Sequence, residues 1–235
     1  ANIPWGVIIM WFAAINMLVG NLMALRQKEV KRMLAYSSVS HMGYFLMGIG
    51  FALAYQQLNG AAGSFFHLIT HAFGKGLAFL SAGTLLYILR LSKHDHSPLL
   101  VTDLDGASRR YPITALAFSI AVLSLGGLPP LGGFMSKWQI FVAGFESQNT
   151  LAMGMVVFTA LNSVLSLGYY APMVNRMYRH EIGDAVKEGG KSNVRLVLPL
   201  VLLSIAIIVL GFWPSLVNWI VSPAAEILMR SFGIG

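Results

Sequence analysis

The sequence predicts an all-α integral membrane protein of about six transmembrane helices, one of which is discontinuous. Composition supports this fold class, because 56% of the residues are hydrophobic and only 11% are charged, whereas soluble domains carry about 25% charged residues. Six apolar runs are long enough to cross a bilayer, which needs about 20 such residues. Basic residues gather between these runs. We therefore expect a single membrane domain over residues 1–235.

The six apolar runs define the expected spans. They cover residues 3–25, 33–55, 61–89, 112–145, 151–175 and 196–213. The fourth run is too long for one straight crossing, and glycine and proline residues interrupt it at Gly126, Gly127, Pro129, Pro130, Gly132 and Gly133. It is either one broken crossing or two separate ones.

The positions of Lys and Arg decide between one crossing and two, because short cytoplasmic loops hold an excess of these residues. Residues 56–60 and 146–150 contain no Lys or Arg, whereas clusters follow the first, third and fifth runs. The clusters are Arg26, Lys28, Lys31 and Arg32, then Arg90, Lys93, Arg109 and Arg110, then Arg176, Arg179, Lys187, Lys191 and Arg195. Basic and non-basic connections alternate only if residues 112–145 cross once. This places the loops after the first, third and fifth spans in the cytoplasm.

The interruption in the fourth run predicts a functional helix break. A simple proline kink is the alternative, but two prolines between two glycine pairs exceed what a kink requires. A broken helix frees backbone groups that lipid cannot satisfy, so the break must lie against protein or a wet cavity.

Lys75 lies at the middle of the third span, fourteen residues from each end. An ionisable group at such depth is costly and is a functional hypothesis by default, because its side chain cannot reach the surface. His67 and His71 precede it by eight and four residues and therefore share its helix face. We expect the three to form a ladder that passes protons through intervening water. Structurally satisfied histidines are one alternative, and a metal pair is another, although no carboxylate or cysteine completes a metal site.

Lys137 is the second lysine within a span, eight residues before the end of its run. Its side chain could extend outward beside Trp138. Its position just after the helix break favours an inward role, because the break supplies backbone groups and room for water.

The second span begins with an unusually polar stretch that contains Lys31, Tyr36, Ser37, Ser38, Ser40, His41 and Tyr44. Such hydroxyls often hold membrane helices together. Lys31 is either an anchor at the cytoplasmic surface or a point of proton uptake, and His41 joins the candidate proton-translocation residues.

Several functional classes are excluded or disfavoured. The chain has no cysteine, which removes thiolate-held iron–sulfur clusters, c-type haem and disulfides. No nucleophile triad, phosphate-cradling loop or dinucleotide fingerprint is present, so we expect no cofactor or metal in this chain and no self-contained enzyme. Membrane topology explains the net charge of +7 better than nucleic-acid binding does. The apolar start lacks a basic n-region and is not a signal peptide.

Three strings of residues carry a family resemblance. GNLMALRQKEVKRMLAYSSVSHMGY from Gly20, FHLITHAFGKGLAFLSAG in the third span and LSLGGLPPLGGFMSKW at the break resemble the antiporter-like proton-translocating membrane subunits of the complex I superfamily. They are most like subunit N (chain 2) of NADH:quinone oxidoreductase or its counterpart in F(420)H(2) dehydrogenase. Subunits of Mrp-type cation/proton antiporters and membrane-bound hydrogenases share these strings.

The resemblance implies an architecture and site roles. It implies that the chain is the C-terminal half of a subunit, with the second inverted five-helix repeat at residues 1–178, a cytoplasmic loop at 179–195 and a final helix and tail at 196–235. Lys137 would be the broken-helix lysine of the exit half-channel, Lys75 with His71 would belong to the central hydrophilic axis, and Lys31 would open the preceding helix.

The resemblance also implies a function and partners. The function is proton translocation in the cell (inner) membrane by a redox-driven NAD(P)H- or F(420)H(2):quinone oxidoreductase. Quinone, flavin and Fe–S centres are then expected in partner subunits of the membrane-bound assembly, and the electrons travel outside this chain. A cation/proton antiporter or hydrogenase subunit is the alternative, and a purely structural scaffold is a third.

Overall fold

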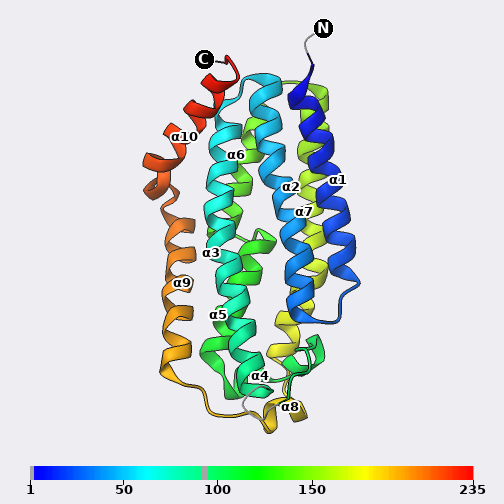
Figure 1. Ribbon diagram of the computed structural model, residues 1–235, viewed down its shortest axis with the longest axis vertical. Helices are drawn as coiled ribbons and strands as arrows, with labels where there is room; N and C mark the ends of the chain where they lie inside the picture. Colours follow the sequence, from blue (N-terminus) through cyan, green and yellow to red (C-terminus); the bar gives the residue numbers. More distant parts are fainter. Residues whose placement is uncertain (1–2, 91–94, 235) are drawn as a thin grey trace.

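A computed structural model describes residues 3–90 and 95–234, which form helices and no strand. The long helices lie alongside one another in an elongated bundle (Figure 1). The elements are α1 (Trp5–Leu25), α2 (Val30–Tyr55), α3 (Leu58–Leu89), η2 (Val101–Leu104), α4 (Ala107–Arg110), α5 (Pro112–Gly126), α6 (Gly132–Glu146), α7 (Thr150–Met177), α8 (Asp184–Lys187), α9 (Val194–Phe212), η3 (Pro214–Val217) and α10 (Asn218–Ser231). The predicted all-α fold is confirmed.

The helix ends follow from local sequence. The side chains of Asn149 and Asn193 accept hydrogen bonds from backbone N–H groups at the starts of α7 and α9, as N-cap residues do. Pro112 is the first residue of α5, where its missing N–H and fixed φ are favourable. Gly127 ends α5 with a φ of 83°, a left-handed conformation that glycine adopts without strain.

Helix α3 is the centre of the bundle. Its 32 residues pack against α2, α5, α6, α9 and α10. Helix α1 packs on α2, and α7 lies against α1 and α5. Because these helices cover α3, protein surrounds the side chain of Lys75.

Within the described residues, four helices are long and apolar enough to cross a membrane on their own, namely α1, α3, α7 and α9. Helix α2 has 26 residues but carries the polar stretch described above. Helices α5 and α6 have 15 residues each, or about 22 Å at 1.5 Å per residue, which is shorter than the roughly 30 Å apolar core of a bilayer. They lie one above the other in Figure 1. Together they form the predicted discontinuous crossing.

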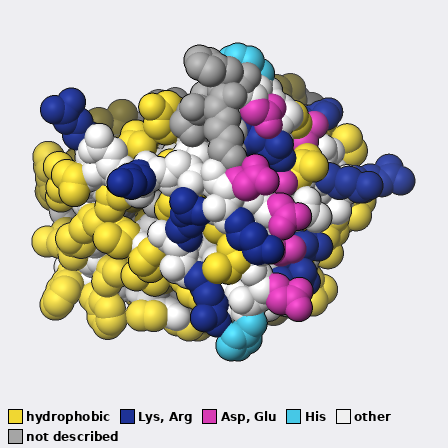
Figure 2. Space-filling view, turned by 90° about the horizontal axis from the view of Figure 1, so that it is seen from below, with side chains coloured by type: hydrophobic (Ala, Val, Ile, Leu, Met, Phe, Trp, Pro, Cys, Tyr) yellow, Lys and Arg dark blue, Asp and Glu magenta, His cyan; other side chains and the backbone are white. Residues whose placement is uncertain are grey.

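The basic connections lie at one end of the bundle. Figure 1 places the α1–α2 connection, α4 and α8 at the lower end, and the α2–α3 and α6–α7 connections at the upper end. Seen from below, Lys and Arg side chains gather with Asp and Glu on part of this end (Figure 2). The basic connections thus lie at one end of the bundle and the non-basic connections at the other. Lys93 lies outside the described residues.

An ionic clamp closes the basic end. Arg176 donates to both carboxylate oxygens of Asp105 at 3.1 and 3.0 Å, and Arg179 donates to one at 3.4 Å. The N–H of Gly106 donates to the carbonyl of Arg176. The clamp joins the connection between η2 and α4 to the end of α7.

A second set of ion pairs lies at the end of α3. Arg90 donates to Asp103 at 2.7 Å and to Asp95 at 2.9 Å. The Ser97 backbone N–H and the Arg90 guanidinium hold the pKa of the Asp95 carboxyl low, at about 2. Asp95 therefore stays ionised, and its pair with Arg90 intact, across the neutral and mildly acidic range.

Replacing Asp105 with asparagine is expected to lower the free energy of unfolding by about 1 kcal/mol, because two arginines lose a partly buried charged acceptor. Thermal unfolding of the purified protein in detergent measures this change. Asp184→Asn is the matched control, since its pair with Lys187 is exposed on both sides and should contribute little. Equal effects of the two substitutions would contradict the clamp.

The residues after the sixth span were predicted only as a tail, but they form helix α10. Helix α10 packs against α3. Val221, Ala225 and Met229 recur every fourth residue and are buried, so one apolar stripe of α10 faces the bundle. This spacing of apolar residues is the pattern in the sequence that could have predicted a packed helix here.

Helix α9 packs directly against the break between α5 and α6. A Cβ added at Gly211 would lie 2.9 Å from the Cα of Leu131. Glycine at this position lets the backbone of α9 touch the backbone of the break.

Candidate functional site

The break leaves the last four carbonyls of α5 without partners inside the helix. Each of them accepts a hydrogen bond from elsewhere. The pairs are Leu123 with the N–H of Leu128 at 3.1 Å, Ser124 with the N–H of Gly127 at 2.9 Å, Leu125 with Lys137 at 2.8 Å and Gly126 with the Ser163 hydroxyl at 3.0 Å. The predicted requirement that protein satisfies the freed backbone is met, and a lysine supplies one of the donors.

Lys137 points into the bundle. Its side chain is 2% exposed, and Nζ donates to the Leu125 carbonyl and to the Ser163 hydroxyl, both at 2.8 Å. Nζ also lies 4.5 Å from the centre of the Tyr44 ring, a cation–π distance. The carboxyl end of α5 adds the partial negative charge of a helix terminus. Outward extension beside Trp138, which is 52% exposed, is therefore wrong.

Lys75 is also buried, at 6% exposure. Its Nζ donates to the Leu34 carbonyl at 2.7 Å and to the Ser37 hydroxyl, both on α2. The ammonium thus bonds to a neighbouring helix, not to the histidines on its own helix. Neither Lys75 nor Lys137 pairs with a carboxylate among the described residues, so both are held by neutral acceptors.

Three histidines meet between α2 and α3. His67 and His71 lie on α3 with ring centres 6.3 Å apart. His41 of α2 lies 5.3 Å from His67 and 5.0 Å from His71, and its Nδ1 is 3.2 Å from Nε2 of His67. His41 therefore joins the two rungs of the ladder. Nε2 of His71 is buried and has no hydrogen-bond partner among the described residues.

Tyr44 and hydroxyl groups connect the histidines to the broken helix. The Tyr44 ring centre lies 5.7 Å from that of His41 and 5.6 Å from that of His67, with Lys137 over its face. Nδ1 of His67 is 3.0 Å from the hydroxyl of Ser136 on α6. Lys75 follows His71 by one turn of α3. Lys75, the three histidines and Lys137 thus form one polar axis inside the bundle, which is defined by these five residues.

Three hydroxyl residues of this site were not predicted from the sequence, namely Ser136, Ser163 and Thr70. Serine and threonine are common in membrane helices, so their type alone gave no signal. Lys31 was a candidate, and the structure leaves it exposed at the start of α2, apart from the polar axis.

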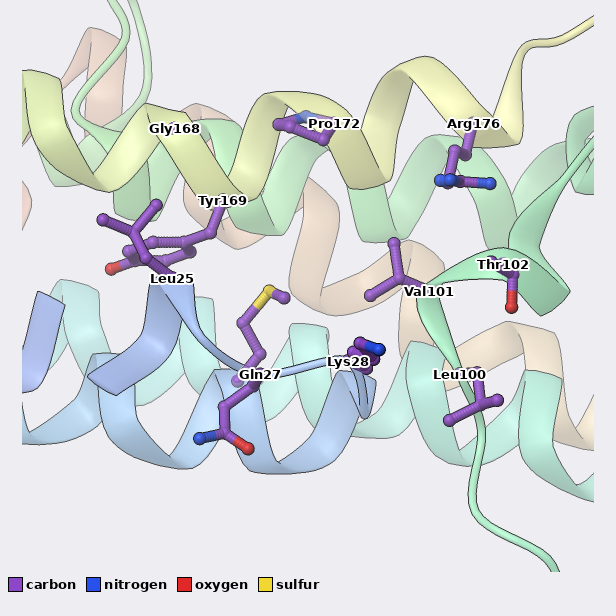
Figure 3. A pocket seen from close by; sticks show the side chains of 11 residues that line it. Leu25, Gln27, Lys28, Leu100, Val101, Thr102, Gly168, Tyr169, Pro172 and Arg176 are labelled. Carbon is purple, nitrogen blue, oxygen red and sulfur yellow. The ribbon is translucent and has the colours of Figure 1, made fainter. Parts of the chain in front are cut away.

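A cavity of about 550 Å³ lies at the basic end between the α1–α2 connection, η2 and α7 (Figure 3). Gln27, Lys28 and Arg176 contribute polar groups to its wall, and Met33 and Tyr169 are also part of it. Met33 directly precedes Leu34, whose carbonyl holds Lys75. The cavity therefore reaches the turn of α2 that carries this acceptor.

Comparison with known families gives one match over most of the chain. The family profile described as NADH:quinone oxidoreductase/Mrp antiporter, TM, covers residues 1–163. The chain is 32% identical over 224 residues to the NADH-quinone oxidoreductase subunit N of Anaeromyxobacter sp. (strain Fw109-5), which is 93% of this chain and 41% of that protein. It is 32% identical over 233 residues to the F(420)H(2) dehydrogenase subunit N of Methanosarcina mazei, covering 97% and 43%. The chain spans about two fifths of these relatives.

Solved structures give the same picture. A chain of respiratory complex I from Thermus thermophilus with bound aureothin is 31% identical, with a TM-score of 0.69 over 89% of this chain and 44% of that one. A chain of the Mrp complex from Dietzia sp. DQ12-45-1b is 21% identical, with a TM-score of 0.76 over 92% and 46%. The latter likeness concerns the fold alone.

Proposed function

This chain belongs to the NADH:quinone oxidoreductase/Mrp antiporter transmembrane family, and from that premise we propose that it translocates protons as part of a membrane-arm subunit of a redox-driven, complex I-like quinone oxidoreductase. The observation that carries the proposal is the polar axis from Lys75 through three histidines to Lys137, in which every member except the partly buried His71 is buried. Buried ionisable groups in membrane helices typically mark ion pathways. The relatives' names, subunit N of two quinone- or F(420)H(2)-linked enzymes, support the redox assignment.

The two lysines would load and release protons. Each is held by a carbonyl and a hydroxyl, which accept hydrogen bonds from an ammonium without fixing its charge as a carboxylate would. Like charges repel in a medium of low dielectric constant, so a proton on one group of the axis disfavours a proton on the next. Protons would then move along the axis in steps.

We also propose the orientation and the partners. The basic end faces the cytoplasm of a cell (inner) membrane, by the excess of Lys and Arg in its loops. The cavity lined by Met33 and Tyr169 lies at that end, and in this proposal protons enter through it toward Lys75. Quinone, flavin and Fe–S centres belong to partner subunits of the assembly, and the remaining part of the proton path lies outside these residues, in the same subunit or in another chain.

A cation/proton antiporter or membrane-bound hydrogenase subunit is the second candidate, because the family description includes the Mrp antiporters. The two candidates differ in what drives transport. Proton movement that requires an electron donor and quinone supports the first, and movement driven by an ion gradient alone supports the second.

Replacing Lys75 with methionine in the complete subunit, within its assembled complex, is expected to lower proton translocation about tenfold, because a positioned proton carrier is removed. The measurement is proton transport per electron in membrane vesicles. Lys191→Met, in an exposed loop, is the control and should transport normally. Normal transport by the Lys75 variant, with assembly intact, would support the structural-scaffold alternative instead.

A further inference from the structure

A chain of hydrogen bonds continues from the histidine pair to the first turn of α6. Nδ1 of His41 is 3.2 Å from Nε2 of His67, and Nδ1 of His67 is 3.0 Å from the hydroxyl of Ser136. The Ser136 hydroxyl also lies 3.1 Å from the Gly133 carbonyl and receives the Thr70 hydroxyl at 2.9 Å. His41, His67, Thr70 and Ser136 are all buried. We call the series from His41 through His67 to Ser136 the wire.

Counting hydrogens shows that the wire has two arrangements. The Ser136 hydroxyl has one hydrogen, and a neutral imidazole has one N–H. If Ser136 donates to the Gly133 carbonyl, it must accept from His67, so His67 carries its hydrogen on Nδ1 and accepts at Nε2 from Nδ1 of His41. If Ser136 instead donates to Nδ1 of His67, every bond of the wire reverses. The two histidines therefore share one tautomer in either arrangement.

We propose that Ser136 is a relay residue that sets the polarity of this wire and passes protons between the histidines and the first turn of α6. The proposal rests on the proposed proton translocation. Hydrogen bonds that form a chain in surroundings of low dielectric constant polarise one another. The orientation of the Ser136 hydroxyl is therefore transmitted to both imidazole rings. Ser136 lies next to Lys137 in sequence, and the two side chains contact different parts of the site.

In a transfer along the wire, a water molecule donates the proton at one end and another accepts the proton at the other end. A proton arrives on Nε2 of His41, and the hydrogen on its Nδ1 moves to Nε2 of His67. The hydrogen on Nδ1 of His67 moves to Oγ of Ser136, whose original hydrogen leaves. One proton has entered, one has left, and the wire has the reverse polarity. A second transfer in the same direction requires the hydroxyl and both rings to turn back, which close packing slows.

A crevice is lined by the sequence neighbours of His67 and Ser136. Phe66 and Met135, the residues before His67 and Ser136, line a crevice of about 340 Å³ between α3, α6 and the α9–α10 junction. The side chains of Asn59 and Gln139 also line it. Amide groups of this kind bind water, and in this proposal the proton that leaves Ser136 passes toward the crevice.

The first test measures histidine tautomers by solid-state ¹⁵N NMR of the complete subunit, with single-histidine variants for assignment. We expect His41 and His67 to hold the same tautomer, and Ser136→Ala to change the tautomer ratio of both rings together. Ser136→Thr keeps the hydroxyl and should preserve the native ratio. Opposite tautomers on the two rings, or a ratio unchanged by Ser136→Ala, would overturn the proposal. A serine that only packs the helices would not move this readout.

The second test measures proton translocation per electron in the assembled complex. Ser136→Ala should lower it about tenfold, and Ser136→Thr should restore it. Ser204→Ala is the matched control, because Ser204 is a buried serine that donates to the carbonyl four residues before it. Normal transport by Ser136→Ala, with Lys137→Ala inactive, would overturn only the relay. Normal transport by both variants would instead overturn the proposed function.

Discussion

Replacing Lys137 with alanine is expected to reduce proton translocation by the assembled complex about 100-fold, the scale of losing a positioned proton-transfer group. Lys137 is the ammonium that meets the freed Leu125 carbonyl of the broken helix, and Ser163 is its second acceptor. No other described lysine or arginine bonds to that break. Alanine leaves the carbonyl and the hydroxyl in place and removes the group that exchanges the proton.

The measurement compares proton uptake per electron with the amount of assembled complex. Lys137→Arg separates charge from proton exchange, because arginine keeps a cation at the break but does not release its proton. We expect the arginine variant to assemble better than the alanine variant and to transport as poorly. Undiminished pumping by Lys137→Ala, with assembly intact, would remove Lys137 from the proton path.

Replacing Gly133 with alanine is expected to lower the free energy of unfolding by about 1–3 kcal/mol, the usual range for overpacking a filled interior. A Cβ at Gly133 would lie 2.7 Å from the carbonyl carbon of Ser124 and 3.0 Å from its hydroxyl oxygen. The N–H of Gly133 donates to that same hydroxyl at 3.1 Å. The two half-helices would have to separate, and Lys137 would move away from the Leu125 carbonyl.

Thermal unfolding in detergent and proton transport in vesicles together measure this effect. Gly154→Ala is the matched control, because an added Cβ there meets no atom within 4 Å and alanine favours a helix. The control should be neutral or slightly more stable. A Gly133 variant with the same stability and transport as this control would contradict the close packing of the break.

Patterns along the chain predicted the spans and the break. Apolar runs of bilayer length gave the helices, and the alternation of basic connections gave a single crossing for residues 112–145. The depth of Lys75 followed from its distance to both ends of α3. These features depend on composition and on spacing within one element, which a sequence displays directly.

The partners of the buried groups were not predictable in the same way. Lys75 bonds to Leu34 and Ser37, which lie 41 and 38 positions earlier in the sequence. Lys137 bonds to Ser163, which lies 26 positions later. Such pairs depend on how helices rotate and pack, and helical periodicity leaves that open. His41 shows the difference, since its type suggested a role but only packing placed it between His67 and His71.

The contact between α9 and the break has a mechanical consequence. At Gly211 the two segments meet backbone to backbone, without a side chain whose rotation could absorb a displacement. Leu198, Leu202 and Ile205 of α9 are exposed on its outer side. A displacement of α9 from that outer side is therefore transmitted to the backbone of the break with little loss.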